Sequence, residues 1–289
     1  MIRRPDTALR RAARSLLPLR VRAAASTVAV RRGWIEPTPP GPFPFQYPFW
    51  ETMAASTSPY PQYQWGTLCA AGLAQALGIP RISVVELGVA GGNGLVELER
   101  QATLATEASG VAIDVHGFDT GTGLTKPVDH RDLPQMWSEG FYAMDPAALR
   151  ARLSTAHLHL GPVADTVPQF LADDHPPIGF VSFDLDLYSS TVDAFGLFRG
   201  SLDAVLPRVV CYFDDVIGFS HGDFSGERLA ITEFNDQHDD RKISQIYGLR
   251  YVLDLDQWWT QQMYLLHAFT HPRYNDPDGT NRLRELPLR

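Results

Sequence analysis

The sequence predicts an α/β domain built on a doubly wound, mostly parallel sheet of seven strands with helices on both faces. Three observations support this prediction. Short apolar runs alternate with helical stretches, the runs are apolar on both faces, and most of them are followed by glycine or aspartate. Strands that are buried on both faces and joined by helices are typical of a Rossmann-like fold.

The elements follow in chain order. A helix is expected from Thr67 to a stop at Gly78 and Pro80. The expected strands are Ile82–Leu87, Val111–Phe118, His157–Leu160, Ile178–Phe183, Val209–Phe213, Leu249–Leu253 and Met263–His267. The expected helices between them are Leu95–Glu107, Pro146–Leu153, Val167–Ala172, Thr191–Phe198 and Glu227–His238. Ligands of such sheets bind beyond the carboxyl ends of the strands, so candidate site residues are those that end each run.

The 289-residue chain is long enough for one substantial core with short extensions. We expect a basic N-terminal arm at residues 1–36, a linker or flap rich in proline and aromatic residues at 37–66, the main domain at 67–275 and a C-terminal tail at 276–289. A poorly ordered arm is favoured over a basic amphipathic surface helix or a transit peptide. The aromatic cluster Phe49, Trp50, Tyr60, Tyr63 and Trp65 is interpreted as a packed flap, with closure over a substrate as the alternative.

Charge and composition exclude several classes of protein. Residues 1–32 contain nine arginines and one acid, so this segment carries a formal charge of +8 and the remainder carries −16 within a total of −8. An acidic body argues against nucleic-acid binding, and no apolar stretch is long enough for a membrane span. Two cysteines cannot form a disulfide scaffold, which favours a reducing, cytoplasmic location. A homo-oligomer is left open.

The first strand runs into a glycine-rich turn, with Glu86, Gly88, Gly91 and Gly92 in the pattern E-x-G-x-x-x-G. Glycines allow the backbone to turn tightly and to approach a ligand, and the following helix presents unpaired N–H groups. The spacing G-x-G-x-x-G is missing, which argues against a nicotinamide dehydrogenase. A carboxylate inside an apolar run is costly without a partner, so Glu86 favours a ligand-binding turn.

The second strand ends at Asp119, within the segment F-D-T-G-T-G-L. A carboxylate at this point of such a sheet can accept hydrogen bonds from the vicinal hydroxyls of a ribose. Asp114 is the rival for this role, but it lies in the middle of the run. Asp119 is therefore the candidate nucleoside-binding acid, with an ordinary turn aspartate as the alternative interpretation.

Four aspartates follow two strands that are expected to be neighbours. Asp184 and Asp186 follow the fourth strand, and Asp214 and Asp215 follow the fifth. Carboxylates this close repel each other unless a cation neutralises them or their pKa values rise. A hard divalent ion such as Mg²⁺ is the simplest solution, since it prefers oxygen ligands.

Together, the segments F-D-L-D-L-Y-S-S-T, F-D-D and G-E-R-L-A-I-T-E-F-N-D-Q-H resemble the macrocin O-methyltransferase family, within the class I S-adenosylmethionine-dependent methyltransferases. The resemblance covers roughly residues 80–240. It implies that S-adenosylmethionine binds at Glu86, Gly88 and Asp119, with the turn glycines Gly91 and Gly92, and that Mg²⁺ binds at Asp184, Asp214 and Asp215. Asp186 would then lie behind the metal ligands or serve the structure. The segment Asp129–Asp145, with Trp137, Phe141 and Tyr142, departs from the family pattern.

The resulting hypothesis is an O-methyltransferase that acts on a hydroxyl group of a small molecule, such as a sugar or another natural product. Asp184 is the candidate base, and His221, in the loop after the fifth strand, is the alternative. A metal-dependent glycosyltransferase that uses Asp184-Leu185-Asp186 is a second hypothesis. A methyltransferase-like domain that binds a nucleoside without turnover is a third.

Overall fold

The structure is a computed structural model that describes residues 52–53, 56–252 and 257–276. The predicted basic arm, most of the predicted linker including Phe49 and Trp50, and nearly all of the predicted C-terminal tail lie outside the described residues. Within the described part of the chain, no helix is both long enough and apolar enough to cross a membrane. Both cysteines are free.

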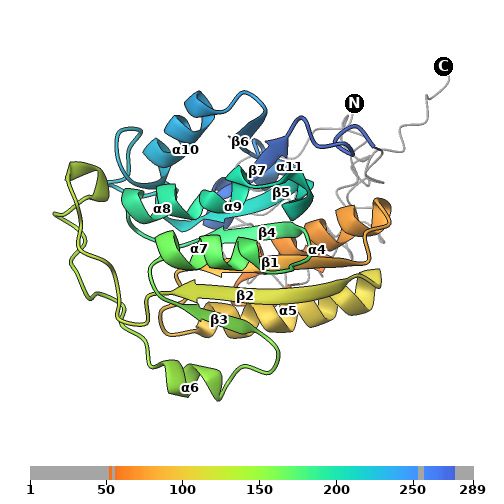
Figure 1. The fold of residues 1–289 in the computed structure, drawn as a ribbon, viewed down its shortest axis with the longest axis horizontal. Coiled ribbons are helices and arrows are strands. Elements are labelled where there is room, and N and C mark those ends of the chain that lie inside the picture. The colour runs from red at the N-terminus through yellow and green to blue at the C-terminus, as the bar shows by residue number, and fades with distance from the viewer. Residues whose placement is uncertain (1–51, 54–55, 253–256, 277–289) are drawn as a thin grey trace, which may run out of the picture.

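A seven-stranded sheet forms the centre of the molecule (Figure 1). Its strands are β1 (Arg81–Leu87), β2 (Ala112–Asp119), β3 (His157–Leu160), β4 (Ile178–Phe183), β5 (Val205–Phe213), β6 (Arg241–Gln245) and β7 (Met263–Ala268). Their order in the sheet is β3-β2-β1-β4-β5-β7-β6. Strands β1 to β5 pair in parallel, whereas β7 is antiparallel to both of its neighbours. The predicted fold class is confirmed.

Helices cover both faces of the sheet (Figure 1). One face packs against α4 (Pro61–Ala76) and α5 (Asn93–Ser109). The other face packs against α7 (Val163–Ala172), α8 (Tyr188–Ala194), α9 (Gly196–Arg199) and α10 (Gly226–Gln237). The shorter elements are η1 (His130–Asp132), α6 (Pro146–Arg150), η2 (Leu202–Ala204), η3 (Asp214–Val216), α11 (Leu249–Val252) and η4 (Trp258–Gln261).

Side chains of the central strands point alternately to the two faces of the sheet and so contribute to both halves of the core. In β1, Ile82 and Val84 point toward α4 and α5, while Val85 and Leu87 point toward the opposite helices, and all four are fully buried. Successive side chains of a strand face opposite sides of a sheet, so an apolar run without polar breaks buries both faces. The two layers fix the loops at the carboxyl ends of the strands.

Several expected element boundaries differ from those of the structure, including the expected helix Thr191–Phe198, which is divided into α8 and α9. Helix α4 begins at Pro61, inside the predicted linker, so that Tyr63 and Trp65 are core residues. Strand β5 begins at Val205 and contains Pro207, which falls where the pairing with β4 shifts register, so its missing N–H is tolerated. The sixth strand is Arg241–Gln245, and the predicted strand at Leu249 begins instead as helix α11.

Candidate functional site

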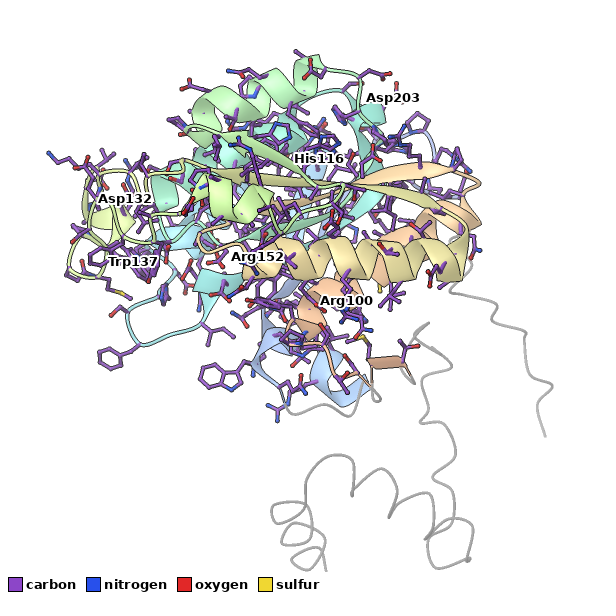
Figure 2. The ribbon with its side chains drawn as sticks, turned by 90° about the horizontal axis from the view of Figure 1, so that it is seen from below. Arg100, His116, Asp132, Trp137, Arg152 and Asp203 are labelled. Atoms are coloured by element: carbon purple, nitrogen blue, oxygen red, sulfur yellow. The ribbon has the colours of Figure 1, made fainter. Side chains whose placement is uncertain are left out.

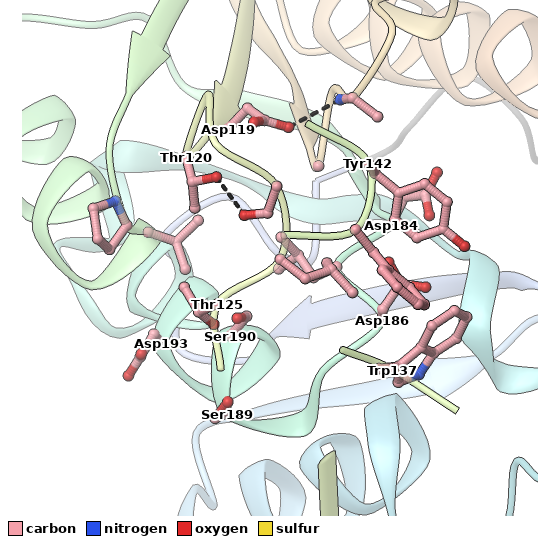
Figure 3. A pocket seen from close by; sticks show the side chains of 18 of the residues that line it. Asp119, Thr120, Thr125, Trp137, Tyr142, Asp184, Asp186, Ser189, Ser190 and Asp193 are labelled. Atoms are coloured by element: carbon pink, nitrogen blue, oxygen red, sulfur yellow. Dashed lines mark hydrogen bonds between the residues drawn. The ribbon is translucent and has the colours of Figure 1, made fainter. Parts of the chain in front are cut away.

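A cavity of about 540 Å³ opens beyond the carboxyl ends of β1, β2, β4 and β5 (Figure 3). Loops after these strands supply most of its lining. Its lining includes Gly88, Ala90, Asp119, Lys126, Trp137, Phe141, Tyr142, Asp184, Asp186, Ser189, Asp193, Asp214 and Asp215. The cavity therefore brings together the glycine-rich turn, Asp119 and all four aspartates that were predicted at the sheet edge.

Close backbone packing explains the first glycine of the turn. Gly88 has a φ of +84°, and a Cβ atom placed there would lie 1.8 Å from the carbonyl oxygen of Asp184. Gly92 has a φ of +80° and precedes the first residue of α5, whereas a Cβ on Gly91 would meet open space. Arg152 braces the turn by donating to the Gly91 carbonyl at 3.0 Å. Only Gly88 among these three glycines lines the cavity.

Asp119 connects the end of β2 to the glycine-rich turn. One carboxylate oxygen accepts hydrogen bonds from the backbone N–H groups of Val89 and Ala90 at 3.0 and 2.9 Å, and the other accepts from Gly121 at 2.7 Å. A carboxylate offers about four lone-pair sites, so part of its accepting capacity stays available on the cavity side. Asp119 thus organises the turn and also lines the cavity.

Glu86 lies behind the cavity wall and does not line it. Its side chain is buried, and one oxygen accepts a hydrogen bond from the Tyr63 hydroxyl at 2.7 Å, while Ser182 donates to the same hydroxyl. The second oxygen is buried without a partner among the described residues. Burial raises the pKa of Glu86 to about 8, although the Tyr63 hydrogen bond opposes this rise. Burial therefore disfavours the ionised form of Glu86.

The loops after β4 and β5 are joined through their acids. The Asp186 N–H donates to the Asp215 carboxylate at 3.0 Å, and the Asp215 N–H donates to the Glu227 carboxylate at 2.9 Å. Glu227 is fully buried in the first turn of α10, and its second oxygen has no partner among the described residues. Burial, followed by the charge of Asp215, holds the pKa of Glu227 well above its usual range.

Asp184 and Asp214 face the cavity as partly buried carboxylates. Burial is the main cause that raises the pKa of Asp184 well above its usual range, and the charges of Asp214 and Asp215 add to it. The Tyr212 hydroxyl donates to the Asp214 carboxylate, and Gln262 donates to the Asp214 carbonyl at 2.7 Å. Burial also raises the pKa values of Asp186 and Asp215. The site therefore holds more carboxylates than it can keep ionised without a cation.

The donor set of this cluster is made of carboxylate oxygens, which suit a hard divalent cation. Among the described residues, however, no group of three or more acidic, histidine or cysteine side chains converges in a geometry that could hold a metal ion. The chemistry of the donors fits such an ion, and the arrangement of their side chains would have to tighten around it.

His221, the alternative base, lies apart from the aspartates that line the first cavity. It lines a second cavity of about 870 Å³ between α10 and the strands β6 and β7. Partial burial lowers the pKa of His221, and the charge of Asp214 opposes this effect. The structure does not bring His221 to the cavity that contains the glycine-rich turn, so its catalytic role stays a prediction.

The segment between β2 and α6, residues 120–145, forms one wall of the cavity, and we refer to it as the insertion. Its two ends pair through backbone hydrogen bonds, from Leu124 N–H to the Phe141 carbonyl at 2.8 Å and from Gly140 N–H to the Leu124 carbonyl at 2.9 Å. A Cβ on Gly123 would lie 2.4 Å from the Phe141 carbonyl oxygen, so glycine permits this crossing. The insertion is therefore an ordered part of the site.

Asp132 anchors the insertion to helix α8. Its carboxylate is buried and accepts hydrogen bonds from Ser189 N–H at 2.8 Å, from the Ser189 hydroxyl at 3.0 Å and from Val128 N–H at 2.7 Å. The Ser189 N–H belongs to the first turn of α8 and has no partner within its helix. Figure 2 shows Asp132 and Trp137 at the same end of the molecule.

Sequence reasoning missed several residues that shape the site. Tyr63 and Tyr212 are apolar-looking positions whose hydroxyls reach Glu86 and Asp214. The role of Glu227 could have been predicted, since an acid in the first turn of the helix that follows Asp215 can accept a hydrogen bond from a backbone N–H group. The hydrogen bonds of Asp132 carried no local signal, because they join segments far apart in the sequence.

No protein-family model matches the sequence, and no curated protein sequence matches it. Solved structures do match. The calicheamicin methyltransferase CalS11 matches with a TM-score of 0.51 at 21% identity, over 70% of this chain and 77% of that chain. The O-methyltransferase from Bacillus cereus in complex with S-adenosylhomocysteine (SAH) has a TM-score of 0.40 at 14% identity, over 75% and 86% of the two chains. The likeness to CalS11, together with the strand order, shows that the chain has the Rossmann-like methyltransferase fold.

Proposed function

We propose that the protein is an S-adenosylmethionine-dependent O-methyltransferase that acts on a hydroxyl group of a small molecule, such as a sugar or another natural product. One observation carries this proposal. A single cavity at the carboxyl edge of a methyltransferase-type sheet joins the glycine-rich turn and Asp119 to a cluster of aspartates. The resemblance of the sequence around these residues to the macrocin O-methyltransferase family supports it.

The cofactor would lie along the turn that follows β1. Gly88 and Ala90 line the cavity there, and Asp119 retains accepting capacity toward a ribose. Gly91 and Gly92 shape the turn and the start of α5 without lining the cavity. Glu86 supports the turn from behind through Tyr63. In this proposal Glu86, Gly91 and Gly92 serve the cofactor indirectly.

A divalent cation such as Mg²⁺ would be held by Asp184, Asp214 and Asp215. The buried carboxylates with raised pKa values fit this group, because added positive charge relieves their repulsion. When bound, such an ion lowers the pKa of a ligating hydroxyl and fixes its position. Asp186 and Glu227 would hold the Asp215 loop in place through their backbone contacts with it.

In this proposal the residues of the protein position the acceptor hydroxyl and accept its proton. An acceptor oxygen forms its bond to the methyl carbon as the carbon–sulfur bond breaks, and sulfur retains the electron pair. The hydroxyl proton must leave, and Asp184 is the cavity-lining carboxylate proposed to accept it. Burial and the charges of Asp214 and Asp215 raise the pKa of Asp184 above its usual range, which makes the carboxylate a stronger base.

The experiment compares methyl transfer and cofactor binding in matched variants. SAH release from S-adenosylmethionine is measured with Mg²⁺ or with EDTA, against a panel of glycosides and phenols. Asp214→Asn and Asp215→Asn should abolish SAH release while SAH binding, measured by calorimetry, stays nearly intact. Asp236→Asn, which changes an exposed acid of α10 outside the cavity lining, is the control and should retain activity. Unchanged turnover in the Asp214 and Asp215 variants would refute the metal-site proposal.

The other hypotheses differ in the outcome of the same experiment. A glycosyltransferase that uses Asp184-Leu185-Asp186 would bind a nucleotide sugar with metal and would not bind SAH. A non-catalytic domain would bind SAH but release none from S-adenosylmethionine with any hydroxyl compound.

A further inference from the structure

The lining of the first cavity carries a strong excess of negative charge. Six aspartates line it, and Lys126 is the cationic side chain among the described lining residues. The six acids are Asp119, Asp184, Asp186, Asp193, Asp214 and Asp215. A lining with six carboxyl groups and, among the described residues, one cationic side chain favours a cationic ligand over an anionic one.

Aromatic rings face this acidic surface from the insertion. Trp137, Phe141 and Tyr142 all line the cavity. The Tyr142 ring contacts those of Trp137 and Phe141, with centroids 6.3 and 6.2 Å apart. Phe141 and Tyr142 remain 45% and 53% exposed, which is high for residues of this size. We refer to Trp137, Phe141 and Tyr142 as the aromatic wall.

The aromatic wall lines the same cavity as the aspartates and lies close to two of them. Figure 3 shows the Tyr142 ring beside Asp184 and Asp186, with Trp137 next to them. The pKa of Tyr142 is raised by partial burial and then by the charges of Asp186, Asp215 and Asp184, which places its hydroxyl within their field. The indole N–H of Trp137 is buried and has no acceptor among the described residues. A ligand oxygen could satisfy this donor.

The backbone at Tyr142 is held in an unfavourable conformation. Its φ is +63°, which for a bulky side chain is an outlier. The crossing of Leu124 with Gly140 and Phe141 fixes this conformation from the side of the insertion. Such strain persists only where the surroundings determine it, and here it aims a partly exposed ring into the cavity.

We propose that the acceptor is a ring alcohol that carries a protonated amine, and that the aromatic wall binds both its apolar ring face and its cation; this inference rests on the proposed function. Aromatic faces attract ammonium groups electrostatically, and the attraction grows when the site is shielded from water. The carboxylates that line the same cavity add to that attraction. An anionic acceptor gains neither the attraction to the aromatic rings nor the attraction to the carboxylates. Tyr142 is then a specificity-determining residue.

The test uses matched probes and matched variants of the full chain, in the presence of SAH and Mg²⁺. The probes are methyl glucosaminide, its N-acetylated form, methyl glucoside and uridine diphosphate glucose. Acetylation removes the charge of the amine and preserves the ring. Tyr142→Asn removes the aromatic ring while keeping a residue that tolerates positive φ, and Tyr142→Phe keeps the ring. Tyr247→Asn is the control, because Tyr247 is an exposed tyrosine that lines the second cavity.

Binding is measured by saturation-transfer NMR and by tryptophan fluorescence. We expect methyl glucosaminide to bind about tenfold more tightly than its acetylated form, corresponding to about 1.4 kcal/mol. Tyr142→Asn should remove most of that preference, whereas Tyr142→Phe and Tyr247→Asn should keep it within about twofold. Tighter binding of uridine diphosphate glucose, equal binding of the amine and its acetylated form, or full binding by Tyr142→Asn would overturn the proposal.

SAH binding to the wild-type protein distinguishes a failure of the proposed acceptor class from a failure of the proposed function. If SAH binds and the amine brings no preference, the proposed function stands and the acceptor class is wrong. If SAH does not bind, the proposed function fails and the acceptor class fails with it.

Discussion

The carboxylate of Asp215 accepts a hydrogen bond from the backbone N–H of Asp186 at 3.0 Å. This contact joins the loop that follows β4 to the loop that follows β5, at the point where four aspartates lie at one cavity. Asp186 has a φ of +61°, a conformation that aspartate adopts more readily than most residues. The acidic cluster is therefore built into the backbone of the two loops and is not a chance gathering of flexible side chains.

The first prediction concerns how pH changes stabilisation by Mg²⁺. Burial raises the pKa values of Asp184, Asp186 and Asp215, so at pH 5.5 a cation must displace more protons from them than at pH 8. Mg²⁺ should therefore raise the Tm more at pH 8 than at pH 5.5, measured by thermal unfolding against EDTA. Asp214→Asn should reduce the difference. A Mg²⁺ effect that is equal at both pH values would contradict the assigned ligands.

A second prediction compares two glycines of the same turn. Gly88→Ala should destabilise the protein by more than about 2 kcal/mol, because φ is +84° and the new Cβ would lie 1.8 Å from the Asp184 carbonyl oxygen. Gly91→Ala meets open space and should change the free energy of unfolding by less than about 0.5 kcal/mol. Chemical denaturation measures both. Equal losses would show that the close approach of Gly88 does not determine the turn.

The anchor of the insertion provides a third prediction. Asp132→Asn places an amide where three donors now meet a carboxylate, which should cost about 1.5–3 kcal/mol. Hydrogen exchange in residues 124–145 should quicken, while SAH binding should change little. Asp129→Asn, at a half-buried acid that pairs with Arg131, should have a much smaller effect. Unchanged exchange in the Asp132 variant would mean that other contacts hold the insertion.

A fourth prediction concerns how low pH changes the stability of the protein through the histidines of β2 and of the edge strand β3. His116 lies in β2 with His157 and His159 of β3 nearby, and its ring nitrogen is 3.2 Å from that of His159. Burial, followed by the positive charges of His159, His157, His175 and Arg81, lowers the pKa of His116 to about 3. Asp173 is the acid whose charge acts on His159.

The folded state of His116 binds a proton less readily than the unfolded state, so its stabilising contribution is present above pH 6.5 and is lost as the pH falls toward 3. The loss is about 1.4 kcal/mol for each pH unit in this window. His116→Gln should therefore gain stability relative to wild type as the pH falls, in denaturation measured between pH 7 and 4. His130→Gln, at an exposed histidine, is the control. A His116→Gln curve that stays parallel to wild type would show that the pKa of His116 is the same in the folded and unfolded states.

Much of the fold could be predicted because the buried strands are continuous apolar runs. Strand β4 matches the predicted run Ile178–Phe183, and all six of its residues are buried. Strand β3 also matches its predicted bounds, His157–Leu160, although none of its residues is fully buried. Strand β6 could not be found this way, since its sequence is RKISQ and Ile243 is its fully buried side chain. An edge strand of polar residues forms through pairing with β7, and that pairing is not visible in local periodicity.

The site was predictable where it depends on strand ends. Parallel strands place their carboxyl ends along one edge, so Asp184 and Asp214 were expected near each other, and both line the cavity. The environment of Glu86 was not predictable, because Tyr63 reaches it from a helix whose docking is a tertiary property. The position of His221 at the second cavity follows from the path of a loop, which sequence alone does not determine.

The most direct test of the central claim is calorimetric titration of the purified full-length protein with SAH, with uridine diphosphate glucose and NAD as comparison ligands. The account predicts saturable binding of SAH at one site, with Asp119→Asn weakening it, and no binding of NAD. At about 100 times its Kd, SAH should also add roughly 2.7 kcal/mol to the stability. Saturable binding of the nucleotide sugar with Mg²⁺, together with no binding of SAH, would contradict the methyltransferase assignment.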